Sequence, residues 1–248
     1  MSMNHPTVRP ILISDVDGES ADSDIIVVGL GCAGAAAALG ATEQGSSVTV
    51  IEWAGPGGSS ALSGGELYLG GGTALQKACG FDDDPGSMEE YLCAALGPDP
   101  DREKIHAYCH GSIEHFDWLV SQGVPFKETL WSSPTWVPPT DDGLMWLGEN
   151  SWPYDRIATP APRGHRVQSE GFGGKVLMEC LTSAVEDAGV EIHEYTRATR
   201  LIVGEDGAVK GVLARRYGED LAFLARKAVI VTAGGFIDNR EMVDLGLP

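Results

Sequence analysis

A glycine-rich turn near the N-terminus constrains the fold more than any other feature of this chain. It reads Gly-Leu-Gly-Cys-Ala-Gly over residues 29–34. The β-branched run at 24–29 predicts a buried strand before it, and the alanine-rich stretch at about 32–44 predicts a helix after it. A second β-branched run at 47–52 predicts another strand. These segments together predict a βαβ unit, in which two parallel strands are joined by a helix that covers their sheet.

The spacing of this turn is typical of dinucleotide binding. Gly29 allows the tight turn, Gly31 the approach of a pyrophosphate, and Gly34 the close contact between helix and strand. The pyrophosphate then lies at the helix N-terminus, where free N–H groups and the helix dipole favour an anion. A carboxylate at the end of the second strand can accept hydrogen bonds from ribose hydroxyls. The predicted cofactor-binding residues of this unit are Gly29, Gly31, Cys32, Ala33, Gly34 and Glu52.

The charge balance excludes one class of partner. The 248 residues contain 17 Lys and Arg against 36 Asp and Glu, which gives a net charge of −19. A chain this acidic is a poor partner for nucleic acid or for an anionic membrane surface, because both carry dense negative charge. We therefore expect a small-molecule substrate and no nucleic acid.

Cysteine usage and hydropathy predict the compartment. The 5 cysteines are irregularly spaced without a CxxC pair, which disfavours a disulfide scaffold or a zinc knuckle and favours a reducing environment. The first 24 residues carry several aspartates and no apolar segment of signal-peptide length. The longest apolar runs, 25–28 and 35–39, are far too short to span a membrane. We expect a soluble cytoplasmic protein without a membrane span.

The rest of the chain predicts further α/β structure. Residues 55–73 contain eight glycines and three serines and predict a loop. Helical periodicity covers 101–122 and 174–188, and no clear period covers 124–163. The segments expected to form strands are 190–196, 198–203, 209–217 and 228–232, of which the second and third form a hairpin around the Glu-Asp-Gly turn at 205–207.

Three segments resemble a known family of FAD enzymes. Residues 57–65 resemble the second flavin motif of the fumarate reductase/3-ketosteroid dehydrogenase family, and 226–236 resemble the strand that returns to the FAD site there. The stretches 164–166 and 171–174 are similar to the segment that leads into that family's next helix. These matches run from about residue 24 to 242 in the family's order. The resemblance implies that FAD is the cofactor.

The resemblance also implies a fold and further site residues. The fold is an α/β, Rossmann-like FAD-binding domain with a parallel sheet, a β-hairpin layer and the start of an irregular α+β substrate-cap segment. We expect a leader at 1–22, a nucleotide-binding core at 23–75 and 165–248, and an excursion toward the substrate at 76–164. Ala198 would face the adenine through its backbone. The other residues implied to bind the cofactor are Trp53, Gly58, Ser59, Ser60, Ser63, Gly64, Gly65, Glu66, Ala233, Gly234 and Gly235.

The sequence departs from the family at three points. Trp53 replaces the usual Lys or Arg after the ribose carboxylate, and Glu66 replaces a small residue. Members of the family are considerably longer. The tyrosines proposed for proton abstraction and carbonyl polarisation in ketosteroid dehydrogenases lie largely in the part that this chain lacks. No residue of the chain is therefore assigned as a catalytic acid or base.

The expected activity is that of a flavin-dependent oxidoreductase. Residues 62–73 are more similar to ketosteroid dehydrogenases than to fumarate reductases, which implies hydride transfer from a 3-ketosteroid-like substrate to FAD. One alternative is fumarate reductase-like reduction of an unsaturated dicarboxylate, for which an Arg/His cluster is needed. Another is a truncated, non-catalytic FAD-binding fragment. The sequence does not identify the electron acceptor. The available cations near the excursion are Arg156, Arg163, His165 and Arg166.

Two other groups of residues have alternative interpretations. His106, His110 and Glu114 share one helix face at metal-ligand spacing, but without an H-E-x-x-H motif we favour a solvated polar face and predict no metal site. Several tryptophans gather in the irregular excursion. They predict equally well an apolar substrate pocket or the core of a small cap. These are Trp131, Trp136, Trp146 and Trp152.

Overall fold

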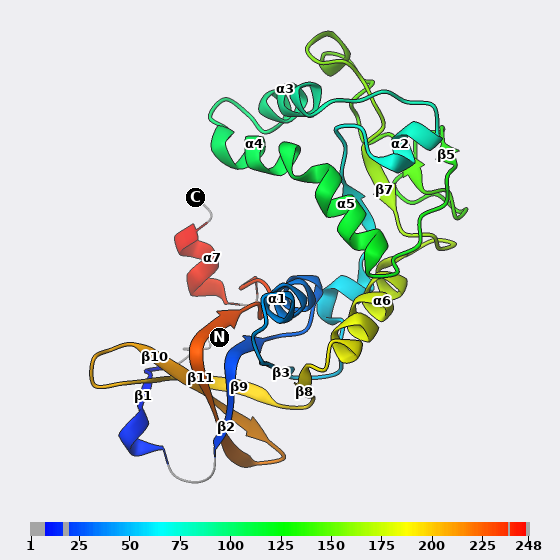
Figure 1. Cartoon of the computed structure of the whole chain (residues 1–248). Helices are drawn as coiled ribbons and strands as arrows, with labels where there is room; N and C mark the ends of the chain where they lie inside the picture. The colour runs from blue at the N-terminus through cyan, green and yellow to red at the C-terminus, as the bar shows by residue number, and fades with distance from the viewer. Residues whose placement is uncertain (1–7, 17–19, 238, 247–248) are drawn as a thin grey trace. The chain divides into compact units, whose positions relative to one another are not determined.

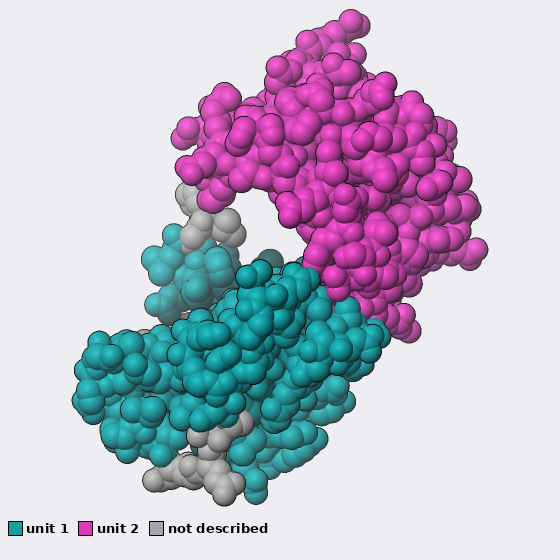
Figure 2. Space-filling model, viewed as in Figure 1, with its two compact units in different colours: residues 1–59, 182–248 teal, residues 60–181 magenta. Residues whose placement is uncertain are grey.

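The computed structural model describes residues 8–16, 20–237 and 239–246, and the chain forms two compact units (Figure 2). Unit 1 comprises residues 1–59 and 182–248, and unit 2 comprises residues 60–181. Among the described residues, no helix has the length and apolar character needed to cross a membrane.

Unit 1 is built on a seven-stranded sheet with the strand order β1-β9-β10-β11-β2-β3-β8 (Figure 1). Strands β11, β2, β3 and β8 run parallel, whereas β9, β10 and β11 are antiparallel neighbours. The strands are β1 (Ile11–Leu12), β2 (Ser20–Val28), β3 (Val48–Ile51), β8 (Glu191–His193), β9 (Arg197–Val203), β10 (Val209–Arg216) and β11 (Glu219–Val231).

Strand β11 joins the hairpin to the parallel sheet. Its first part pairs with β10, and most of its length also pairs with β2, so the predicted hairpin layer is continuous with the nucleotide-binding sheet. The apolar core spans this junction, because Ile26 of β2, Val212 of β10 and Phe223 of β11 are buried in one cluster. Helix α1 (Cys32–Glu43) buries Gly34, Ala35, Ala38, Leu39 and Ala41, and α7 (Arg240–Gly246) follows β11.

Unit 2 combines helices with a small four-stranded sheet of order β4-β7-β6-β5. Two of its helices, α3 and α4, pack through Met88, Ile105 and Cys109, which are all buried. The strands are β4 (Glu66–Tyr68), β5 (Leu130–Trp131), β6 (Leu144–Met145) and β7 (Gly164–Arg166). The helices are α2 (Ala74–Ala78), α3 (Pro85–Ala95), α4 (Arg102–His110) and α5 (Ser112–Ser121), and α6 (Gly174–Asp187) continues from unit 2 into unit 1.

The α/β class, the first βαβ unit, helix α6 and the β9–β10 hairpin confirm the sequence predictions. The units differ from the expected boundaries: residues 60–75 and 165–181 belong to unit 2, because β4 pairs with β7 in its sheet. Of the predicted leader, residues 1–7 and 17–19 lie outside the described residues, and β2 already begins at Ser20.

One local prediction was wrong. The single helix expected at 101–122 divides at Gly111 into α4 and α5, because glycine is a weak helix former and buried Ser112 accepts a hydrogen bond from the Gly70 N–H instead of solvent. Residues 82–86 contain the start of α3. There, Asp84 caps the helix through the Ser87 N–H, and Pro85 occupies its first position.

Candidate functional site

The glycine turn of unit 1 has no room for side chains at two of its three glycines. Gly29 follows β2 with φ of 98°, and a Cβ there would lie 2.6 Å from the Thr232 carbonyl oxygen. A Cβ on Gly34 would lie 1.9 Å from the Gly29 carbonyl oxygen. Both distances are far below van der Waals contact. Helix α1 therefore approaches the end of β2 as closely as the sequence motif predicted.

The N-terminus of α1 is suited to an anion. Gly31 is its N-cap residue, no side chain caps the helix, and its first turn contains no acidic residue. Cys32 and Ala33 are exposed at this end. The peptide dipoles of α1 therefore point their positive end at an accessible backbone surface, which fits a pyrophosphate group.

Glu52 lies directly after β3 and is almost fully buried. Its Oε2 accepts a hydrogen bond from the Leu30 N–H at 2.7 Å, and its Oε1 accepts one from the Ala54 N–H at 2.9 Å. This carboxylate thus ties the glycine turn to the end of β3. Two carboxylate oxygens have about four acceptor positions, so Glu52 can also accept hydrogen bonds from ribose hydroxyls.

Two other predicted segments lie against the same turn. The Gly57 N–H donates to the Leu30 carbonyl oxygen at 2.7 Å, and a Cβ on Gly58 would lie 3.8 Å from the Gly31 Cα. On the other side, a Cβ on Gly29 would lie 3.2 Å from the Cα of Ala233. Ser59 follows Gly58 in the chain, and Gly234 and Gly235 follow Ala233. All three residues are exposed.

A surface hollow in unit 1 contains Trp53 and Ala198. Its volume is about 460 Å³. The Arg197 guanidinium carbon lies 4.7 Å from the centroid of the Trp53 ring, so the exposed indole has a cation stacked on one face. The sequence identified Trp53 and Ala198 but missed the rest of the lining: Val8, Tyr195, Arg197, Thr199 and Arg215.

The second flavin-type motif lies in unit 2 from Ser60 onward, and its backbone packs against the start of α6. The Gly64 carbonyl oxygen accepts from the Gly173 N–H at 2.7 Å, and that of Ser63 accepts from the Gly174 N–H at 3.1 Å. A Cβ on Gly65 would lie 2.6 Å from the Gly173 carbonyl carbon, and one on Gly174 would lie 2.3 Å from the Ser60 carbonyl oxygen. Gly65 and Gly174 are thus required for this packing.

Glu66 has a structural partner in unit 2. It pairs in register with Arg166 across β4 and β7, and its Oε1 lies 3.6 Å from the Arg166 Nε. The Arg166 guanidinium is buried and donates to the backbone carbonyls of Thr140, Asp142 and Gly171. Arg166 is therefore already bound by carbonyl oxygens of the chain.

Arg163 and His165 also form contacts within the protein interior. The Arg163 Nε donates to Asp83 Oδ2 at 3.0 Å and its Nη2 donates to Asp83 Oδ1 at 2.7 Å, with both side chains buried. The His165 Nε2 is 2.7 Å from the Thr73 hydroxyl, and its Nδ1 is 3.1 Å from the Arg163 carbonyl oxygen. Of the four cations considered for a dicarboxylate, only Arg156 is largely exposed.

Burial of His165 predicts a dependence of stability on pH. Desolvation lowers the pKa of the imidazole to about 4 from an ordinary value of 6.5. The unfolded chain therefore binds a proton that the folded chain does not, so the free energy of unfolding decreases as pH falls from 6.5 toward 4, by at most about 3 kcal/mol. Urea titrations followed by tryptophan fluorescence measure this in unit 2, because all tryptophans except Trp53 lie there.

A His165→Gln variant is expected to lose most of the decrease between pH 6.5 and 5, above the range in which ordinary carboxylates titrate. The comparison with the parent chain isolates the contribution of this ring. Equal slopes of unfolding free energy against pH in the two proteins would contradict the assignment.

The tryptophans of the excursion do not form a common core. Trp136 and Trp152 are 81% and 82% exposed, so they are not core residues. Trp146 packs edge-on against Phe81 and Trp136 against Phe172.

Comparisons with known proteins agree with this geometry. The chain matches the FAD binding domain family over residues 24–244. It is 34% identical to the 3-oxo-5-alpha-steroid 4-dehydrogenase of Comamonas testosteroni over 77% of this chain and 37% of that protein. The structure of a Rhodococcus jostii 3-ketosteroid-delta4-(5alpha)-dehydrogenase, in complex with 4-androstene-3,17-dione, superimposes with a TM-score of 0.91 and 46% identity, over 96% of this chain and 51% of that one.

A flavocytochrome c3 fumarate reductase is more distant, with a TM-score of 0.74 and 25% identity over 92% of this chain and 36% of that one. The chain thus spans about half the length, or less, of these relatives. The family match covers both the glycine turn and the segment after β11 that lies beside it. This chain therefore belongs to the FAD binding domain family, and FAD is its cofactor.

Proposed function

We propose that this chain is the FAD-binding part of an oxidoreductase that dehydrogenates a 3-ketosteroid-like substrate. The observation that carries the proposal is the 46% identity, along 96% of the chain, to the Rhodococcus jostii ketosteroid dehydrogenase. When bound, FAD accepts a hydride from a saturated carbon of the substrate. The residues of this chain contribute binding and orientation of the cofactor.

In unit 1 each part of the site has a separate role. The exposed N-terminus of α1, beyond Gly31, would bind the pyrophosphate through backbone N–H groups. Glu52, held by Leu30 and Ala54, would bind the ribose without a change of rotamer. The hollow containing Trp53 and Ala198 would hold the adenine, with the backbone of Ala198 as its polar contact. The remaining predicted contacts of this unit are Gly29, Cys32, Ala33, Gly34, Gly58, Ser59, Ala233, Gly234 and Gly235.

In unit 2 the loop that begins at Ser60 would present backbone N–H groups and Ser63 to the isoalloxazine ring. Its packing on Gly173 and Gly174 fixes the loop conformation. A preformed loop loses little conformational entropy when the ring binds. The further predicted contacts are Gly64, Gly65 and Glu66, although the ion pair of Glu66 with Arg166 indicates a role in anchoring the loop.

The buried cations of unit 2 favour a steroid over a dicarboxylate. A site for two carboxylates requires cationic side chains that are free to bind them. Arg163, His165 and Arg166 instead bind Asp83, Thr73 and backbone carbonyls in the protein interior. Releasing Arg163 toward a substrate would leave the buried Asp83 carboxylate without its counter-ion, which costs several kcal/mol. The proposed substrate is accordingly apolar, with a ketone as its polar group.

Absorbance spectroscopy of the purified chain tests this proposal. We expect a flavin spectrum that co-purifies with the chain or develops when FAD is added. Under anaerobic conditions, the ring-saturated counterpart of 4-androstene-3,17-dione should bleach the flavin band. Fumarate should fail to restore the band after photoreduction.

The opposite pattern, in which fumarate reoxidises the flavin and the steroid leaves it unchanged, would favour a dicarboxylate substrate and overturn the steroid proposal. A flavin band that responds to neither compound would indicate that the chain is a non-catalytic FAD-binding fragment. A chain that takes up no FAD at all would contradict the proposed function as a whole.

A further inference from the structure

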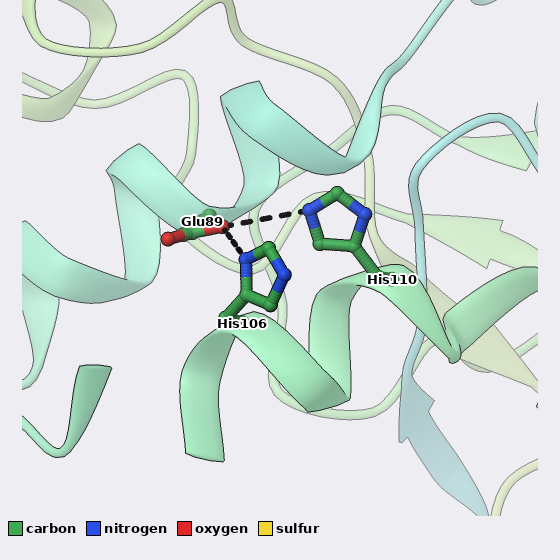
Figure 3. Close-up of side chains that lie close together, drawn as sticks. All are labelled: Glu89, His106 and His110. Carbon is green, nitrogen blue, oxygen red and sulfur yellow. Dashed lines mark hydrogen bonds and ion pairs between the residues drawn. The ribbon is translucent and has the colours of Figure 1, made fainter. Parts of the chain in front are cut away.

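Three side chains with metal-binding atoms meet on the surface of unit 2. Glu89 comes from α3, and His106 and His110 come from α4 (Figure 3). The His106 Nδ1 is 2.9 Å and the His110 Nε2 is 3.6 Å from the same oxygen, Oε2 of Glu89. One ligand atom from each residue lies within 4.8 Å of the other two.

The set differs from the one that the sequence singled out. His106 and His110 do share a helix face, but Glu114 lies beyond the break at Gly111, on α5. The third group is Glu89, which is 17 residues from His106 in sequence and comes from the neighbouring helix. The sequence prediction of a solvated polar face rested on the residues of one helix. In the structure, the Glu89 carboxylate of the neighbouring helix faces both imidazoles.

The packing of α3 against α4 fixes this arrangement. Each of the three residues directly follows a buried residue of the seam between the helices, and those seam residues are Met88, Ile105 and Cys109. Their exposures are 0%, 5% and 0%, so the backbone that carries each ligand is held by the core. The arrangement therefore exists without a metal and needs little reorganisation to bind one.

We propose that Glu89, His106 and His110 form a binding site for a zinc-class divalent cation that clips α3 to α4. Two ligand atoms on a tetrahedral zinc ion lie about 3.3 Å apart, given metal–ligand bonds of about 2.0–2.1 Å. The distances from the imidazole nitrogens to the Glu89 oxygen, 2.9 and 3.6 Å, lie on either side of that value.

The donor set selects the class of metal. Two imidazoles and one carboxylate suit Zn²⁺, Ni²⁺ or Cu²⁺, whereas Ca²⁺ and Mg²⁺ prefer sites made of oxygen. The His110 ring is 49% exposed and the Glu89 side chain 29% exposed, so water can complete the coordination. Among the residues that the structure describes, the ion pairs of Glu89 are with these two imidazoles. A bound cation would replace the contacts of Glu89 with the two imidazoles by three metal–ligand bonds.

Isothermal titration of the FAD-loaded, tag-free chain with ZnCl₂ tests the site. We expect one Zn²⁺ per chain with a dissociation constant in the micromolar range. His106→Asn, His110→Asn and Glu89→Gln should each weaken binding by about 10- to 100-fold, as removal of one of three ligands would. His115→Asn on α5 is the matched control and should leave the affinity unchanged.

A second measurement links binding to the two helices. Zn²⁺ should raise the unfolding temperature of the parent chain, detected by tryptophan fluorescence, and have no such effect on Glu89→Gln, which keeps the size and exposure of the side chain. Zinc binding that persists in both His106→Asn and Glu89→Gln would place the metal elsewhere, for example on a cysteine thiol, and overturn the proposal. A dissociation constant of the parent chain above a millimolar would do the same.

Discussion

A Gly34→Ala variant is expected to purify without flavin colour and to bind added FAD about 100-fold more weakly than the parent chain. The new methyl group would lie 1.9 Å from the Gly29 carbonyl oxygen and 3.0 Å from the Thr232 hydroxyl oxygen. A backbone oxygen cannot move aside as a flexible side chain does, so the start of α1 must shift away from β2. Overpacking of this kind costs about 3 kcal/mol, which corresponds to the expected loss of affinity if the cost falls on the pyrophosphate site.

The same helix offers a matched control. Gly40 lies in α1 as well, and a Cβ there would meet no atom within 4 Å. Gly40→Ala should therefore keep the FAD affinity and stabilise the helix by up to about 1 kcal/mol, because alanine is the better helix former. Fluorescence titration of the apo chains with FAD measures both affinities. Parent-like binding by Gly34→Ala would show that the close approach of α1 to β2 is dispensable for the cofactor.

The parts of the site that the sequence predicted depend on local patterns. The turn from Gly29 to Gly34 joins a strand to the helix that directly follows it, so its glycine spacing reflects contacts within a few residues. Glu52 could be predicted because it directly follows the next strand, and the carboxyl ends of parallel strands meet at one edge of the sheet. The start of α3 carries an equally local signal, because Asp84 is its N-cap residue and Pro85 occupies its first position.

The parts that could not be predicted depend on contacts between distant residues. The strands of unit 2 are two or three residues long, too short for an alternating pattern to be recognised. Arg163 and Asp83 are 80 residues apart, and nothing in either segment indicates that the arginine is buried. The hollow beside Trp53 likewise combines residues of β9 and β10 with the segment after β3. Sequence reasoning therefore counted Arg163 and Arg166 as available cations when both are internal.

The Arg163–Asp83 pair gives the largest expected effect on stability. In an Arg163→Met variant, the Asp83 carboxylate would stay buried, with 1% of its side chain exposed, after losing both guanidinium hydrogen bonds. Breaking a buried ion pair by removing one partner costs about 3–5 kcal/mol, because the remaining charge has neither water nor a counter-ion. Urea unfolding followed by tryptophan fluorescence should show this loss, since all but one of the tryptophans lie in unit 2.

The Arg215–Asp220 pair is the matched control, because its geometry is similar and only its exposure differs. The Arg215 Nε is 2.8 Å from Asp220 Oδ1 and Nη2 is 3.0 Å from Oδ2, but the side chains are 58% and 46% exposed. Water replaces the lost partner there, so Arg215→Met should lower the free energy of unfolding far less than Arg163→Met does. If Arg163→Met were as mild as Arg215→Met, Arg163 would be free to leave Asp83 at little cost, and the argument against a dicarboxylate substrate would lose its physical basis.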